Sequence, residues 1–192
     1  MTGDLLSLIL VILLLILASA FFSSAETALT AASDARMRQL AGKGNRRAKL
    51  VEKLRDDREG LIGSILIGNN AVNVIASALA TSVFISVLDD AGVLWATVTM
   101  TVILVVFAEV VPKTYAFNNS DNYALMIAPA VRAVVIILSP LSIALRMLAN
   151  SLIGTRRNQE ADREEELRGM IELHGADGDA DDRETQAMLS SV

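Results

Sequence analysis

Residues 93–111 read VLWATVTMTVILVVFAEVV, an apolar run that carries a single acidic residue, Glu109, and is followed at once by Pro112. Its length of about 19 residues matches a bilayer core roughly 30 Å thick, so the run predicts a membrane-spanning helix. A carboxylate at the centre of such a helix costs at least ~3 kcal/mol, even on the gentlest scale. We therefore expect Glu109 to face an ion, a partner or a water-filled cavity rather than lipid.

The whole chain has the composition of a helical integral membrane protein. Of its 192 residues, 53% are hydrophobic, and these lie in long blocks. The chain has no Cys and a single His, which excludes disulfides, thiolate metal sites and a cysteine nucleophile. The ligand chemistry that remains is that of oxygen, which suits hard cations such as Mg2+ or Ca2+.

Two further apolar runs, at residues 5–30 and 61–88, predict the other spans. The expected fold class is therefore all-α integral membrane, with three transmembrane helices. A signal peptide is the alternative for the first run, but the residues before it include Asp4 and no basic residue. Residues 89–92 predict a tight outer turn between the second span and the third.

Residues 33–60 are rich in Arg and Lys, so by the positive-inside rule this loop is cytoplasmic. The N-terminus is then outside and the C-terminus cytoplasmic, in a multi-pass protein of the inner (plasma) membrane. Ser33 offers a helix cap, and residues 42–45 (GKGN) predict a break between two short helices. No nucleic-acid partner is expected, because a basic cytoplasmic loop is ordinary in a membrane protein.

Residues 124–149 are apolar enough for a further span, but their pattern favours a kinked interfacial belt helix on the cytoplasmic side. Pro129 and Pro140 interrupt the stretch, and Arg132 and Arg146 would lie outside if it crossed the membrane. A crossing helix is the alternative.

The composition changes after residue 150, where acidic residues become frequent. We assign residues 1–150 to the transmembrane domain and residues 151–192 to a cytoplasmic acidic linker helix. The linker supplies much of the negative charge behind the net charge of −5. A new apolar segment begins at its end, which predicts that a soluble domain follows.

Three polar clusters lie within the predicted spans, around Ser23, around Asn69 and Asn73, and at Glu109. At a rise of about 1.5 Å per residue, all three reach the inner half of the bilayer. Asn69 and Asn73 are four residues apart and share one helix face. Carboxylate, amide and hydroxyl oxygens suit a hard cation, and Mg2+ is the candidate that we favour. We therefore predict a metal site formed by Ser23, Asn69, Asn73 and Glu109.

The backbone near these residues has features that could serve an ion. Gly68 permits close approach of another helix, and Pro112 has no N–H for the carbonyl of Ala108, which frees an oxygen beside Glu109. The alternatives are interhelical hydrogen bonding for the Ser and Asn side chains, and an ion pair with Lys113 for Glu109. Enzymatic activity is not expected, because the spans hold no His or Lys that could act as a base for a serine.

Three motifs together resemble the transmembrane domain of the CorC/cyclin M family of magnesium transporters, in the family's order and spacing. They are residues 21–29 (FFSSAETAL), 68–73 (GNNAVN) and 109–113 (EVVPK). The resemblance covers essentially the whole chain and is to the bacterial branch. Cyclin M proteins typically have Gly at the position of Ser24 and Asn at that of Glu26.

The resemblance implies a homodimer in the lipid bilayer, with three membrane helices per subunit and a cytoplasmic belt. It also implies a regulatory pair of CBS domains beyond residue 192. Family members are linked to Mg2+ efflux, with Na+ as the candidate coupling ion. Ser23, Asn69, Asn73 and Glu109 match the family's polar core, with Asn70 as a further candidate ligand. The expected function is Mg2+ transport, and the alternative is a non-transporting membrane anchor or sensor.

Overall fold

The computed structural model describes residues 2–153, and every regular element in that range is a helix. The chain divides into two units, Met1–Ala144 and Leu145–Val192, and the first contains the three predicted spans. The linker predicted over residues 151–192 lies almost wholly outside the described residues.

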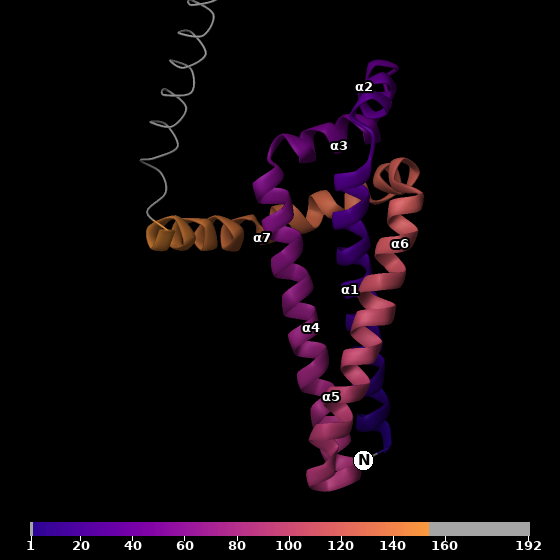
Figure 1. Ribbon diagram of the computed structural model, residues 1–192, viewed down its shortest axis with the longest axis vertical. Coiled ribbons are helices and arrows are strands. Elements are labelled where there is room, and N and C mark those ends of the chain that lie inside the picture. Colours follow the sequence, from indigo (N-terminus) through magenta and orange to yellow (C-terminus); the bar gives the residue numbers. More distant parts are fainter. Residues whose placement is uncertain (1, 154–192) are drawn as a thin grey trace, which may run out of the picture. The chain divides into compact units, whose positions relative to one another are not determined.

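Three helical runs of the first unit lie side by side in Figure 1. They are α1 (Thr2–Ala31), α4 (Arg58–Leu88) and a composite run of α5 (Gly92–Ile103), η2 (Leu104–Val110) and α6 (Val111–Asn118). These runs contain the three spans predicted from the apolar blocks. The third run is longer than predicted, because the helix continues through Pro112 to Asn118.

By length and composition, three helical segments are able to cross a membrane: Leu5–Ala31, Arg58–Asn118 and Ser120–Leu145. The second segment has 61 residues and contains two of the predicted spans, because the chain reverses within it at η1 (Asp89–Ala91). The third segment is the stretch for which a belt helix was predicted, and its composition alone would allow it to cross.

The reversal at η1 is very tight. Asp89 adopts a positive φ of 50°, and Gly92 packs directly against the last turns of α4. A Cβ atom at Gly92 would lie 2.5 Å from the backbone nitrogen of Ile85 and 2.5 Å from the carbonyl carbon of Phe84. The turn predicted at residues 89–92 is thus present, and it depends on the absence of a side chain at Gly92.

Two short helices follow α1, namely α2 (Asp34–Gly42) and α3 (Arg46–Asp56). Side-chain oxygens of Ser33 and Asn45 accept hydrogen bonds from backbone N–H groups in the first turn of α2 and α3, respectively. Gly44, between the helices, adopts a φ of 87°, which glycine tolerates best. The prediction of two short helices separated at residues 42–45 is confirmed.

α7 (Ser120–Ile153) is one continuous helix through Pro129 and Pro140, where the sequence analysis expected interruptions. Each proline removes one backbone hydrogen bond, and the many remaining bonds keep the helix intact. The helix also begins earlier than predicted, at Ser120 rather than at residue 124. Its first turn is closed by the N–H of Tyr123, which donates to the carbonyl of Asn119 at 3.0 Å.

Within the first unit, α7 lies across α1 and α4 (Figure 1). Near its start, Tyr123 Oη lies 3.0 Å from Ser24 Oγ on α1. Further along, Ser142 Oγ would lie 3.2 Å from a Cβ atom at Gly63 on α4. The buried cluster that joins α1 to α7 includes small side chains that are 0% exposed, which permits close packing: Ala25, Ala28, Ala124 and Ala128.

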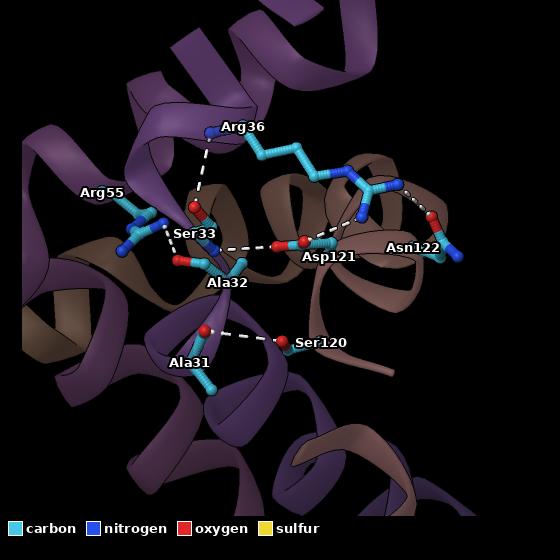
Figure 2. Close-up of polar contacts among 8 residues, drawn as sticks. All are labelled: Ala31, Ala32, Ser33, Arg36, Arg55, Ser120, Asp121 and Asn122. Carbon is cyan, nitrogen blue, oxygen red and sulfur yellow. Dashed lines mark hydrogen bonds and ion pairs between the residues drawn. The ribbon is translucent and has the colours of Figure 1, made fainter. Parts of the chain in front are cut away.

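Figure 2 shows how the start of α7 is fixed to the junction between α1 and α2. The Asp121 carboxylate accepts from the backbone N–H of Ser33 at 2.8 Å and from the Arg36 guanidinium at 3.1 Å. On the other side of the junction, Arg55 donates to the carbonyl of Ala32 at 2.9 Å. This cation lies at the C-terminal end of α1, where it complements the helix dipole.

Candidate cation site

One ion pair fixes how α1 and α6 face each other. Glu26 Oε2 lies 3.7 Å from Lys113 Nζ. Lys113 was the alternative partner for Glu109, and that alternative is wrong: the Lys113 side chain crosses to α1 instead of folding back along its own helix. Within the described chain, the carboxylate of Glu109 takes part in no ion pair or hydrogen bond.

The same ion pair places Ser23 and Glu109 near one level of the two helices. Ser23 is three residues before Glu26 and shares its face of α1, and Glu109 is four residues before Lys113, about one turn away along the third run. The groove lined by Glu26 and Lys113 continues along later residues of both helices, Ala31 on α1 and Phe117 on α6. The two helices therefore run in the same direction. The helical rise then places Ser23 about 4.5 Å and Glu109 about 6 Å from the ion pair, on the same side of it.

α1 and α4 are antiparallel and pack closely. Early in α1, Ile12 clusters with Ala76 of α4. Later in α1, Phe22 meets Gly68, which comes earlier in α4 than Ala76. A Cβ atom at Gly68 would lie 2.6 Å from Phe22 Cζ. The prediction that Gly68 permits a close approach is confirmed.

Asn69 is held against α1 by an interhelical hydrogen bond, the alternative role expected for the Ser and Asn side chains, and its partner is Ser19. Ser19 Oγ donates to Asn69 Oδ1 at 2.9 Å. Because the helices are antiparallel, Ser23 lies about 6 Å from this bond towards the α2 end of α1, and Asn73 lies about 6 Å from it in the opposite direction. Asn69 is thus the asparagine nearer to the level of Ser23, whereas Asn73 is separated from Ser23 by about 12 Å along the helix axes. The position of Ser19, one turn before Ser23, was the signal in the sequence.

Two of the predicted ligand atoms are buried without a hydrogen-bond partner. Ser23 is 1% exposed, and both its Oγ and the Oδ1 of Asn73 lack a partner in the described chain. Such an atom costs about 1–3 kcal/mol unless something satisfies it, so both oxygens are suited to receive a ligand. Asn69 and Glu109 are half-buried, and Asn70 is exposed.

Glu109 lies in a π-helical turn, η2, rather than in the α-helix that the sequence predicted. The N–H of Val111 donates to the carbonyl of Val106, five residues earlier. Single π-helical turns of this kind occur frequently at functional sites. The hydrophobic pattern contains no signal for it, because the turn lies within an uninterrupted apolar run.

Pro112 follows the π-helical turn directly. We expected Pro112 to free the Ala108 carbonyl on the assumption of α-helical, four-residue spacing. The bond from Val111 to Val106 spans five residues, so that spacing does not hold at the residue before Pro112.

The residues of the candidate site comprise one carboxylate, Glu109, and the neutral oxygens of Ser and Asn side chains. In residues 2–153, His, Cys, Asp and Glu side chains nowhere gather in groups of three that could hold a metal ion. Glu109 is the charged group near the level of Ser23, and Glu26 follows about one turn after Ser23 on α1. This donor set is all oxygen, which fits a hard cation held with moderate affinity.

Comparison with known proteins identifies the family. The family described as the cyclin M transmembrane N-terminal domain matches residues 9–184. The chain is 47% identical over 106 residues to the UPF0053 inner membrane protein YfjD of Escherichia coli (strain K12), covering 55% of this chain and 25% of that protein. It is 31% identical over 189 residues to a UPF0053 protein of Haemophilus influenzae, covering 96% and 45%. It is 32% identical over 188 residues to a chloroplastic DUF21 domain-containing protein of Arabidopsis thaliana, covering 95% and 28%.

In each of these matches the chain spans less than half of the relative's length. The family match covers most of the chain, including all three polar motifs. The chain is a helical membrane protein that belongs to the cyclin M transmembrane N-terminal domain family.

Proposed function

We propose that this chain is the membrane domain of a Mg2+ transporter, with Glu109 as the charged ligand of the transported ion. One observation carries the proposal: the Glu26–Lys113 ion pair holds α1 against α6 about one turn from Ser23 and Glu109, which places these two residues near one level. Glu109 has no ion pair or hydrogen bond of its own within the described residues, although it lies in an apolar helix. A carboxylate in that position requires a cation or water to be stable.

The oxygens are arranged along a path rather than in a single shell. Ser23 and Glu109 lie near one level, Asn69 follows about 6 Å outward, and Asn73 about 12 Å outward. A Mg2+ ion that loses part of its hydration at Glu109 would meet the Asn69 and Asn73 amides in turn. One carboxylate among neutral oxygens holds such an ion moderately, which permits its release.

The setting of this transporter is also part of the proposal. We infer a homodimer in the inner membrane, with the N-terminus outside and the C-terminus cytoplasmic, and with CBS domains following the chain. The name of the Escherichia coli relative, an inner membrane protein, supports the location. Transport is outward, with Na+ as the candidate coupling ion and Mg2+ as cargo. The chain performs no enzymatic reaction.

One observation favours a second function, that of a membrane anchor or sensor without transport. The hydrogen bond between Ser19 and Asn69 is of the kind that holds membrane helices together. If the remaining polar residues only serve packing, the chain binds no Mg2+ within the membrane.

Calorimetric titration of the purified chain with Mg2+ distinguishes the two functions. Glu109→Gln keeps the shape of the side chain and removes its charge, so we expect the affinity to fall by at least about tenfold. Glu52→Gln is the matched control, because Glu52 lies on α3, outside the predicted spans. Equal binding by the parent and both variants would refute the cation site. Binding that depends on Glu109, without Mg2+ flux in liposomes, would favour the sensor.

A further inference from the structure

Glu26 and Lys113 lie in an open groove between α1 and α6, inward of the candidate site. The groove has a volume of about 410 Å3, and its other lining residues are Thr27, Thr30, Ala31 and Phe117. The side chains of Glu26 and Lys113 are 36% and 45% exposed. A hydrated ion could therefore reach the pair from the groove.

One end of the groove lies beside the junction between α1 and α2, close to the basic residues of α2 and α3. Ala31, at its inner end, accepts a hydrogen bond from Ser120 Oγ at the junction shown in Figure 2. This junction leads into α2 and α3, whose basic residues place it on the cytoplasmic side by the positive-inside rule. An ion that approaches Glu109 from the cytoplasm would then meet Glu26 first, one helical turn earlier.

We propose that Glu26 and Lys113 form a charge gate at the cytoplasmic mouth of the ion path, in which the Lys113 ammonium competes with the incoming divalent cation for Glu26. The gate rests on the proposed transport function and adds an entry site to it. Glu26 is a relay carboxylate that a hydrated cation contacts through its water, before it loses water at Glu109. Lys113 occupies that position when no ion is there.

The geometry of the pair suits exchange. At 3.7 Å, the distance from Glu26 Oε2 to Lys113 Nζ exceeds that of a hydrogen bond, so the attraction is mainly between charges. The nearby Thr30 hydroxyl is occupied, because it donates to the backbone carbonyl of Glu26 at 2.7 Å. A lysine is a compact charge on a flexible stem, so Lys113 can move aside without disturbing the backbone of α6.

The gate predicts opposite effects for its two members. Replacing Lys113 with Gln leaves the Glu26 charge uncompensated, which attracts a divalent cation. Replacing Glu26 with Gln leaves the Lys113 charge uncompensated, which repels it. Replacing both restores a neutral mouth. A pair that only holds α1 and α6 together predicts the same sign for both single variants, because each would loosen the same contact.

The test is Mg2+ titration of the purified chain and its variants at low and high NaCl. We expect Lys113→Gln to lower the apparent Kd and Glu26→Gln to raise it, each by about three- to tenfold at low salt, as for half-exposed charges a few ångströms from the ion. The double variant should lie within about twofold of the parent, and high salt should shrink all three shifts. Lys43→Gln, which removes an exposed lysine outside the groove, is the control and should leave the Kd unchanged.

Three results would overturn the gate. Shifts of the same sign in both single variants would show a packing contact, and thermal melting of each variant would reveal the loosened fold. Unchanged affinities in both, with binding abolished by Glu109→Gln, would show that the ion does not pass Glu26. Binding unaffected by Glu109→Gln would refute the proposed function itself, and with it the gate as its entrance.

Discussion

Gly92→Ala is expected to lower the free energy of unfolding, because it disturbs the tight turn between α4 and α5. The new Cβ atom would lie 2.5 Å from both the Ile85 nitrogen and the Phe84 carbonyl carbon, and 2.6 Å from the Phe84 oxygen. Carbon atoms pack best at about 3.5–4.0 Å, so the two helices would have to separate by roughly 1 Å at the turn. These are backbone atoms, which cannot rotate away as a side chain can.

The magnitude follows from two opposing terms. Overpacking a close contact costs about 1–3 kcal/mol, and a clash with backbone belongs at the upper end. A Gly to Ala change in a helix otherwise stabilises by about 0.5–1 kcal/mol, because the unfolded chain loses freedom. The expected net loss for Gly92→Ala is therefore about 2 kcal/mol.

The assay is thermal or denaturant unfolding in detergent, with Gly42→Ala as the matched control. Gly42 ends α2 and has nothing within 4 Å of its Cβ position, so the same chemical change meets open space there. We expect Gly42→Ala to be neutral or slightly stabilising. If Gly92→Ala were as stable as Gly42→Ala, the close approach at the turn would be refuted.

Two further predictions concern hydrogen bonds between helices. Ser19→Ala removes the donor to Asn69 and should lower the unfolding free energy by about 0.6–1.7 kcal/mol in a membrane environment; additive effects of Ser19→Ala and Asn69→Leu in a double-mutant cycle would contradict the bond. Tyr123→Phe removes the contact with Ser24 and should cost about 1 kcal/mol. Tyr115→Phe, at an exposed position, is its control, and an equal loss in both variants would show that the bond to Ser24 contributes nothing.

The helices could be predicted because their signals are local. Long apolar blocks determine α1 and α4, and the caps at Ser33 and Asn45 determine where α2 and α3 begin. The continuity of α7 could not be predicted, because a proline ends a helix only when the remaining hydrogen bonds and packing do not compensate. That balance depends on the neighbouring helices, which the sequence pattern does not specify.

The polar residues of the candidate site can be read from the sequence, but their arrangement cannot. Ser23 and Glu109 were expected to meet, and the ion pair about one turn away places them near one level of α1 and the third run. Asn73 was expected to meet Ser23 in the inner half of the bilayer, whereas the bond between Ser19 and Asn69 sets a register that separates them by about 12 Å along the helix axes. Register is decided by side-chain packing between helices, so neither this bond nor the ion pair could be derived from one helix at a time.

The π-helical turn also rotates the side chains that follow it about the axis of the third run. It holds one residue more than the α-helical turns on either side, and one residue corresponds to about 100° of rotation about the axis. The outer part, α5, packs against α4, whereas the inner part, α6, packs against α1. Without the extra residue, one of these two faces would turn away from its partner. Glu109 lies within the turn that lets α5 face α4 while α6 faces α1. The residues of this turn therefore set both the direction of the Glu109 side chain and the packing of the three helical runs.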